Sequence, residues 1–182
     1  MKEHNNTALY LDMDGVFTDF ITQAHKAFKY FHLLEGLYED ELTAVGKMKL
    51  RDQMRWDIAN YEDFWSKMPW ERGGKKLYNF VHKNFNHDNI HILTAPLSND
   101  PTCHNGKTQW IKDNFTKINN IVDRMLIDDI KWNYVNHLKA DYQILVDDRT
   151  KNINLWIEHG GIGILHDSSN VEATIEKLSR YI

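Results

Sequence analysis

Short apolar runs alternate with stretches of helical periodicity along most of the chain. The runs have the length of strands and lack helical spacing; they cover residues 8–11, 89–96, 124–127, 142–146 and 161–165. Between them, apolar residues recur at three- and four-residue spacing, which predicts helices over residues 75–85, 107–115, 132–138 and 152–159. Strands that alternate with helices indicate βαβ units, and therefore an α/β fold with a Rossmann-like parallel sheet and helices on both faces.

The segment from residue 17 to residue 69 breaks this alternation, because it contains no convincing strand. Its apolar spacing predicts a helix from Phe20 to Leu34 that ends near Gly36, and two shorter helical pieces at residues 50–59 and 61–68. Loops between a strand and a helix in α/β units are usually two to six residues long, so this segment is too long for a loop. We therefore expect a helical cap at residues 17–69, inserted after the first strand of a core domain formed by residues 1–16 and 70–182.

Length, composition and net charge indicate a globular protein of one domain with an insertion, but they do not indicate a function. The 182 residues suffice for one domain with an insertion, and 42% hydrophobic and 26% charged residues are ordinary for a soluble protein. No apolar run is long enough to span a membrane, and the polar N-terminus lacks a signal peptide, so we expect a cytoplasmic protein. The single cysteine fits a reducing compartment. A net charge of −4 argues against an extended nucleic-acid surface.

Asp12 and Asp14 stand one residue apart at the end of the first apolar run and are followed by Gly15. A strand that ends in this way places Asp12 at the carboxyl edge of the sheet, where α/β proteins bind ligands. Two carboxylates this close repel each other unless a cation lies near them, and a hard, oxygen-liganded ion such as Mg²⁺ suits them. The pair also suits a division of labour between a nucleophile and a proton carrier. The plainer alternative is an Asp-Gly turn with solvated acids.

Further polar residues follow the later strands and should meet these acids, because right-handed crossovers bring all carboxyl ends to one edge. Thr94 ends the second predicted strand. Two acidic pairs are available: Asp128–Asp129 follows the third strand, and Asp147–Asp148 follows the fourth. Three lysines compete to supply positive charge beside them: Lys107, Lys131 and Lys139.

The ordered set resembles the four motifs of the haloacid dehalogenase superfamily of phosphotransferases: Asp12 to Val16, Thr94, Lys131 and Asp147–Asp148. More narrowly, the chain resembles the 5′(3′)-deoxyribonucleotidase family. The matching pieces are Asp12 to Phe20, Phe64–Trp65, Leu93 to Pro96, Lys107 to Lys112 and Val146 to Arg149. Two departures are Ala95, where mammalian members have serine, and a longer stretch between Lys131 and Asp147.

The resemblance implies a role for each residue. Asp12 would attack phosphorus and form an aspartyl-phosphate, while Asp14 would protonate the leaving oxygen and then activate water. Mg²⁺ would be held at Asp12, the Asp14 carbonyl and Asp148, next to Asp147. Thr94, next to Ala95, would donate a hydrogen bond to phosphate, and Lys131 would supply positive charge to it. Lys107 opens a predicted helix and is a further candidate to reach the phosphate. Phe20, at the start of the cap, is the candidate for stacking on a base.

The sequence therefore predicts a magnesium-dependent phosphomonoesterase that acts on nucleoside monophosphates, with deoxyribonucleotides favoured. The enzymatic alternative is a phosphatase for another small phosphate ester or for a nucleic-acid 3′-phosphate end. A non-catalytic, nucleotide-binding regulatory domain is the alternative from another class. The expected partner is a small-molecule nucleotide, and a homodimer is left open.

Overall fold

The computed structural model describes residues 6–28, 44–97 and 100–182, and its centre is a five-stranded parallel sheet. The strands are β1 (Thr7–Leu11), β2 (Ile90–Thr94), β3 (Met125–Ile127), β4 (Tyr142–Asp147) and β5 (Ile162–Leu165). Their order is β3-β2-β1-β4-β5, and every neighbouring pair is parallel. The chain moves outward from β1 to β3 and then crosses back to β4 on the other side. The predicted Rossmann-like α/β fold is confirmed.

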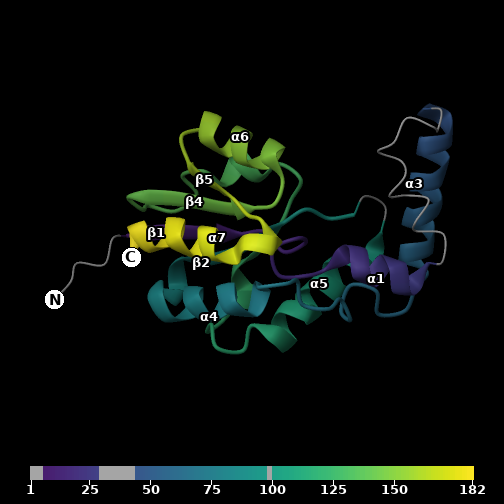
Figure 1. Ribbon diagram of the computed structural model, residues 1–182, viewed down its shortest axis with the longest axis horizontal. Helices are drawn as coiled ribbons and strands as arrows, with labels where there is room; N and C mark the ends of the chain where they lie inside the picture. Colours follow the sequence, from purple (N-terminus) through teal and green to yellow (C-terminus); the bar gives the residue numbers. More distant parts are fainter. Residues whose placement is uncertain (1–5, 29–43, 98–99) are drawn as a thin grey trace.

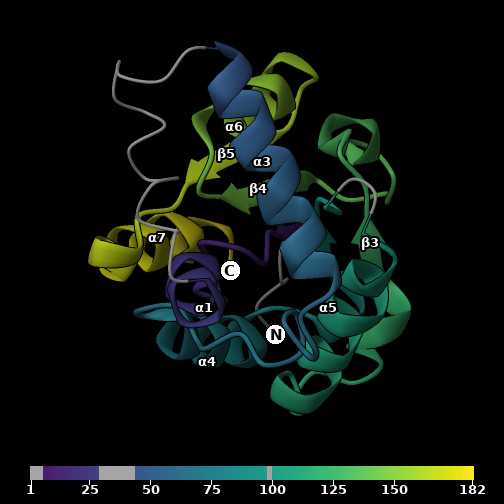
Figure 2. The same ribbon diagram turned by 90° about the vertical axis from the view of Figure 1, so that its right-hand side faces the viewer.

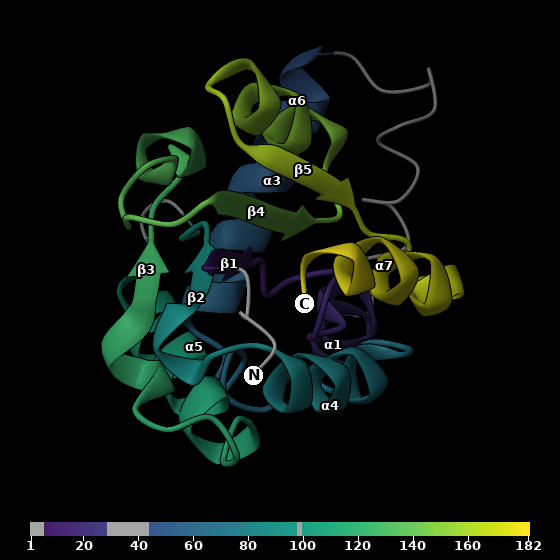
Figure 3. The ribbon, with the colours of Figure 1, turned by 90° about the vertical axis from the view of Figure 1, so that its left-hand side faces the viewer.

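The two faces of the sheet bury alternate residues of the central strand against different helices. Leu9 and Leu11 belong to the larger core, together with residues of α4 (Gly74–Asn84), α5 (Pro101–Asn114) and α7 (Val171–Leu178). Ala8 and Tyr10 face a smaller core that includes Ile153 and Trp156 of α6 (Thr150–Glu158). Figures 1 and 3 show these helices on the two sides of the sheet, as predicted. All five residues of β1 are buried, which explains why this strand is an apolar run rather than an alternating one.

The described part of the predicted cap forms two helices, α1 (Phe20–Ala27) and α3 (Ala44–Ala59), beyond the carboxyl ends of the strands (Figure 1). Figure 2 looks onto this side and shows α3 crossing in front of the sheet. The chain leaves and re-enters the core through adjacent segments, because the backbone N–H of Asp19 donates to the Pro69 carbonyl at 2.9 Å. The cap boundaries at residues 17 and 69 stay a prediction. The helix predicted from Phe20 to Leu34 is wrong in its extent, because α1 ends at Ala27 and the backbone of Phe28 is extended; the rest of that prediction lies outside the described residues. Helix α3 begins six residues before the predicted start at residue 50.

Two further predicted helices do not form as α-helices, and in both segments the backbone contains a residue with positive φ. Residues 61–68 form a series of turns, in which Asp63 has φ of 60°. The prediction at residues 132–138 is replaced by a 3-10 helix at Lys131–Tyr134 followed by turns, with φ of 71° at Asn136. An α-helix cannot continue through a left-handed residue, and Asp and Asn adopt that conformation more readily than most residues.

Two further differences lie outside these turns. Helix α5 begins six residues earlier than predicted, because Pro101 is its first residue and the Asp100 side chain caps it by accepting from the Thr102 N–H. Helix α7 is not predicted from the spacing at all. No helix in the described segments combines the length and the apolar character that crossing a membrane requires.

The turns at residues 61–68 pack directly on α5, and Gly106 permits the close approach. A Cβ at this position would lie 2.5 Å from the Cβ of Trp65 and 3.4 Å from the Ser66 nitrogen. On the same helix, Trp110 donates its indole N–H to the Met68 carbonyl at 2.7 Å. The absence of a side chain at Gly106 therefore fixes how closely the returning cap segment lies against the core.

We expect Gly106→Ala to lower the free energy of unfolding by about 1–3 kcal/mol, as overpacking does in a filled core. The substitution should otherwise favour the helix by up to about 1 kcal/mol, so the sign of the change is diagnostic. Asn105→Ala, at the exposed neighbouring position of α5, is the matched control and should leave stability unchanged or slightly raised. Urea unfolding of the three proteins measures the effect. A Gly106→Ala protein as stable as Asn105→Ala would contradict the packing described here.

Candidate active site

The first acid of the site continues the central strand. The Asp12 backbone N–H donates to the Val146 carbonyl of β4 at 2.9 Å, so its position is fixed by the sheet. Its side chain is buried, and Oδ1 accepts from the backbone N–H of Met13 at 2.8 Å. The chain then turns sharply: the Met13 carbonyl accepts from the N–H groups of Phe17 and Thr18, and Gly15 has φ of 77°. A left-handed residue is easily provided by glycine at this turn.

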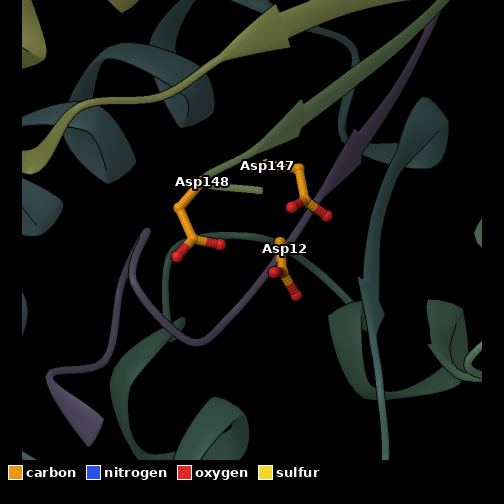
Figure 4. A group of neighbouring side chains, drawn as sticks. All are labelled: Asp12, Asp147 and Asp148. Atoms are coloured by element: carbon orange, nitrogen blue, oxygen red, sulfur yellow. The ribbon is translucent and has the colours of Figure 1, made fainter. Parts of the chain in front are cut away.

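Three carboxylates converge where β1 and β4 end (Figure 4). Oxygen atoms of Asp12, Asp147 and Asp148 all lie within 4.8 Å of one another. Asp12 and Asp147 are buried, whereas Asp148 is exposed. Gly15 forms the facing wall, because a Cβ there would lie 2.4 Å from Oδ2 of Asp148. Three oxygen donors at this spacing are suitable ligands for Mg²⁺, which prefers carboxylate oxygens.

A buried lysine joins two of these acids. Lys131 follows β3, and its Nζ lies 2.7 Å from Oδ1 of Asp12 and 2.6 Å from Oδ2 of Asp147. Burial opposes its charge, but the two carboxylates outweigh this effect and raise the pKa of Lys131. Asp147 is held in turn by Asn152, whose Nδ2 lies 2.9 Å from Oδ2, and by the backbone N–H of Arg149 at 2.8 Å. The lysine is thus charged and fixed in place.

A second buried lysine holds the second acid. Lys107 lies on α5, and its Nζ donates to Oδ2 of Asp14 at 2.7 Å, to Oγ1 of Thr94 at 2.9 Å and to the Ala95 carbonyl at 2.7 Å. The other carboxylate oxygen of Asp14, Oδ1, accepts from the Thr18 hydroxyl at 2.9 Å. Both oxygens of Asp14 are therefore engaged away from the three clustered carboxylates.

The electrostatics of the site favour a bound dication. Although Asp148 is exposed as a residue, its carboxyl group faces Gly15 and the other two acids. Desolvation there, followed by the negative charges of Asp12 and Asp147, raises the pKa of Asp148 to about 7. Burial likewise raises the pKa of Asp12, although Lys131 opposes the shift. A divalent cation among these oxygens would favour their ionised forms and would displace the proton that Asp148 holds below about pH 7. The chemistry of the donor set therefore fits Mg²⁺.

The structure brings most of the predicted site residues to one place and separates the competing ones. Asp12, Asp14, Thr94, Lys107 and Lys131 share the contacts described above. Of the two acidic pairs that the sequence offers, Asp147–Asp148 lies in the cluster with Asp12, and Asp128–Asp129 does not. In that pair Asp128 instead accepts from the Ile130 N–H at 2.8 Å. Lys139 is exposed. Asp14 is predicted to bind the metal through its backbone carbonyl, which stays a prediction; its carboxylate lies outside the cluster.

Phe20 lies at the start of α1 and is partly buried against two aromatic side chains. Its ring centroid is 5.6 Å from that of Phe64 and 5.9 Å from that of Trp65. Sequence reasoning does not assign roles to Asn152 and Thr18. A signal for Asn152 exists, since it lies on the first turn of the helix that follows Asp147–Asp148. Thr18 could be found only from the tight turn that brings it back to Asp14.

Solved structures of haloacid dehalogenase-like hydrolases share this architecture. One from Xanthomonas campestris gives a TM-score of 0.55 at 11% identity, over 99% of this chain and 94% of its own. Another from Streptococcus pneumoniae gives 0.54 at 13% identity, over 93% and 98% of the two chains. The HAD-hydrolase YfnB from Bacillus subtilis, in a form bound to magnesium, gives 0.54 at 13% identity, over 88% of each chain.

These similarities are structural rather than sequence matches. No known protein-family profile matches the sequence, and the comparison with curated proteins finds no match. The narrower resemblance to deoxyribonucleotidases stays a prediction. The central parallel sheet, its strand order and the near-complete overlap with these hydrolases agree with the four motifs read from the sequence. The chain therefore has the haloacid dehalogenase-like fold.

Proposed function

We propose that this protein is a magnesium-dependent phosphomonoesterase that forms an aspartyl-phosphate on Asp12. One observation carries the proposal: two acids one residue apart are each held by a separate buried lysine, beside a cluster of three carboxylates. Identical side chains are thereby given different surroundings, which is the arrangement expected when one is a nucleophile and the other a proton carrier.

Asp12 is the group placed to attack phosphorus. Lys131 and the Met13 N–H both contact Oδ1, so we assign the attack to Oδ2. As the bond from Oδ2 to phosphorus forms, the bond from phosphorus to the ester oxygen breaks. Asp14 gives its proton to that oxygen and later removes a proton from the water that hydrolyses the aspartyl-phosphate. The sheet and the lysine contacts hold both acids before substrate arrives, which reduces the cost of ordering them.

The phosphate would be bound by groups that keep an unused hydrogen-bond donor. Lys131 has three N–H donors and contacts two carboxylates, which leaves one donor for a phosphate oxygen. The Thr94 hydroxyl accepts from Lys107, so its own O–H is available to donate. Mg²⁺, held by Asp12, Asp148 and the neighbouring Asp147, would offset the negative charge of the transferring phosphoryl group.

Nucleoside monophosphates are the proposed substrates, with deoxyribonucleotides favoured by the resemblance of the Asp12 to Phe20 motif. In support, the partly buried Phe20 stands six residues after Asp14 at the start of the cap. Its aromatic neighbours Phe64 and Trp65 keep its ring in place. An aromatic ring at this position would stack on a base, a contact worth about 1–3 kcal/mol.

The proposed function is tested by phosphate release from ribo- and deoxyribonucleoside monophosphates with Mg²⁺, Ca²⁺ or EDTA. We expect turnover with Mg²⁺, little with Ca²⁺ and none with EDTA, because Ca²⁺ relaxes the octahedral geometry. Asp12→Asn should lower the rate more than about a thousandfold, since asparagine cannot replace the nucleophile. Asp129→Asn, an exposed acid outside the cluster, is the control and should retain full activity. A folded Asp12→Asn protein with normal turnover would remove Asp12 from the mechanism.

Gly15 gives a test of the cation site that does not remove a ligand. Gly15→Ala would push a methyl group against the Asp148 carboxylate, and we expect Mg²⁺ to bind at least about tenfold more weakly. Gly160→Ala is matched in backbone strain, because Gly160 has φ of 94°, but a Cβ there would meet no heavy atom of the described chain within 4 Å. Both variants should lose about 1–2 kcal/mol of stability, whereas only Gly15→Ala should lose Mg²⁺ affinity by calorimetric titration. Equal affinities in the two variants would place the cation elsewhere.

Phe20→Ala tests the nucleotide assignment. Loss of base stacking should lower kcat/KM about tenfold on a deoxynucleotide, but much less on para-nitrophenyl phosphate, which has no base. Ile21→Ala, at the exposed next position of α1, controls for changes in the helix itself. If Phe20→Ala lowers both rates in parallel, its ring packs the cap and does not contact the base. Melting temperatures of both variants identify a loss of folding.

A further inference from the structure

The Lys107 ammonium group has no donor left for a substrate. Its Nζ makes three hydrogen bonds, to Asp14, Thr94 and the Ala95 carbonyl, and an ammonium group has three N–H donors. Its side chain is only 1% exposed. Lys131 differs, because it contacts two carboxylates and keeps one donor. The two buried lysines are thus suited to different tasks, and Lys107 is suited to holding Asp14 rather than to binding phosphate.

The remaining side of the Lys107 ammonium group is covered by an aromatic ring from the cap. Its Nζ lies 5.0 Å from the centroid of the Trp65 ring, within the range of a cation–π contact. Such a contact is stronger where both partners are desolvated, and Trp65 is only 3% exposed. The ring therefore compensates part of the hydration that the buried ammonium group has lost.

Trp65 is itself fixed from two directions. Its indole N–H donates to Oδ2 of Asp100 at 2.6 Å, and this buried carboxylate also caps α5, the helix that carries Lys107. Its Cβ packs against Gly106, the residue before Lys107, where an added Cβ would lie only 2.5 Å from it. The Trp65 ring and Lys107 are therefore both held by α5: Lys107 is part of this helix, and Trp65 contacts its capping residue and Gly106.

We propose that Trp65 is a positioning residue, which holds Lys107 by its ring face and through Lys107 orients the Asp14 carboxyl group for proton transfer. This inference rests on the proposed function and adds a link between the cap and the acid. Displacement of the ring would let the ammonium group shift, and Asp14 would lose the contact at Oδ2. A catalytic group moved by about 1 Å can lose as much as a hundredfold in rate.

The diagnostic is the dependence of kcat/KM on the leaving group, because kcat/KM reports the step in which the ester oxygen departs. Phenyl phosphate releases a basic phenolate that needs a proton, whereas para-nitrophenyl phosphate releases a stable anion that needs one much less. Neither substrate has a nucleobase, so base stacking does not enter the comparison. A misplaced Asp14 should therefore slow phenyl phosphate selectively, while a general loss of structure slows both substrates.

The experiment measures kcat/KM of the full chain with Mg²⁺ on both aryl phosphates for wild type, Trp65→Leu and Trp65→Phe. We expect Trp65→Leu to lose about tenfold more on phenyl phosphate than on para-nitrophenyl phosphate. Trp65→Phe keeps a ring face but loses the hydrogen bond to Asp100, and should show the same selectivity to a smaller degree. If Trp65→Leu does not fold, the substrate selectivity of Trp65→Phe alone tests the proposed role of Trp65.

Trp70 provides a matched control within the same chain. Its indole N–H donates to Asn114 at 2.9 Å, and Lys75 lies 5.8 Å from its ring centroid, but Trp70 has no contact with Lys107 among the described residues. Trp70→Leu should therefore change both substrates in parallel. Parallel losses in the Trp65 variants of an active enzyme would overturn this inference alone. A wild-type protein that hydrolyses no phosphate ester would overturn the proposed function and this inference with it.

Discussion

The balance of buried charge at the end of β1 is the constraint on which the rest of the site depends. Four carboxylates and two lysines meet there, and the lysines are almost fully removed from water. A buried ammonium group without a partner would be strongly destabilising, so each lysine must stay beside its acid. When every group is ionised, two negative charges remain without a protein partner. A dication bound by the clustered carboxylates would supply that charge.

Sheet topology explains why these charges can gather at all. The strand order places β1 between β2 and β4, at the point where the chain reverses its direction of progress across the sheet. The connections that follow β1 and β4 therefore lead to opposite sides of the sheet, which leaves room for a site above the ends of these two strands. The register between β1 and β4 aligns the two acids. Leu11 pairs with Val146, so Asp12 and Asp147, the residues that follow them, lie side by side. A shift by one residue would turn one of the two carboxylates to the opposite face.

The elements that could be predicted from the sequence are those with a local cause. The inner strands β1, β2 and β4 are buried and form continuous apolar runs, and the partly buried edge strands β3 and β5 are short apolar runs as well. All five can therefore be predicted, together with the acids that end β1 and β4. The turns at residues 61–68 could not, because their aromatic residues recur at three- and four-residue spacing without forming a helix. That spacing satisfies the rule for an amphipathic helix, but the left-handed backbone of Asp63 prevents one, and the contacts of Trp65 and Met68 hold the segment on α5.

The choice among the lysines shows where local reasoning ends and where the site acquires its specificity. Lys107, Lys131 and Lys139 are chemically alike in the sequence, and burial beside particular carboxylates separates them. Lys107 is 93 residues from Asp14 along the chain. The contact joins α5 to the turn after β1, and the Trp65 ring lies 5.0 Å from the same Nζ. The two acids of one short turn therefore have different supports: Lys131 and the sheet for Asp12, and α5 with the cap for Asp14. If Trp65 acts as proposed, a shift of residues 61–68 against α5 would change the surroundings of Asp14, whereas Asp12 is held by Lys131 and by the sheet.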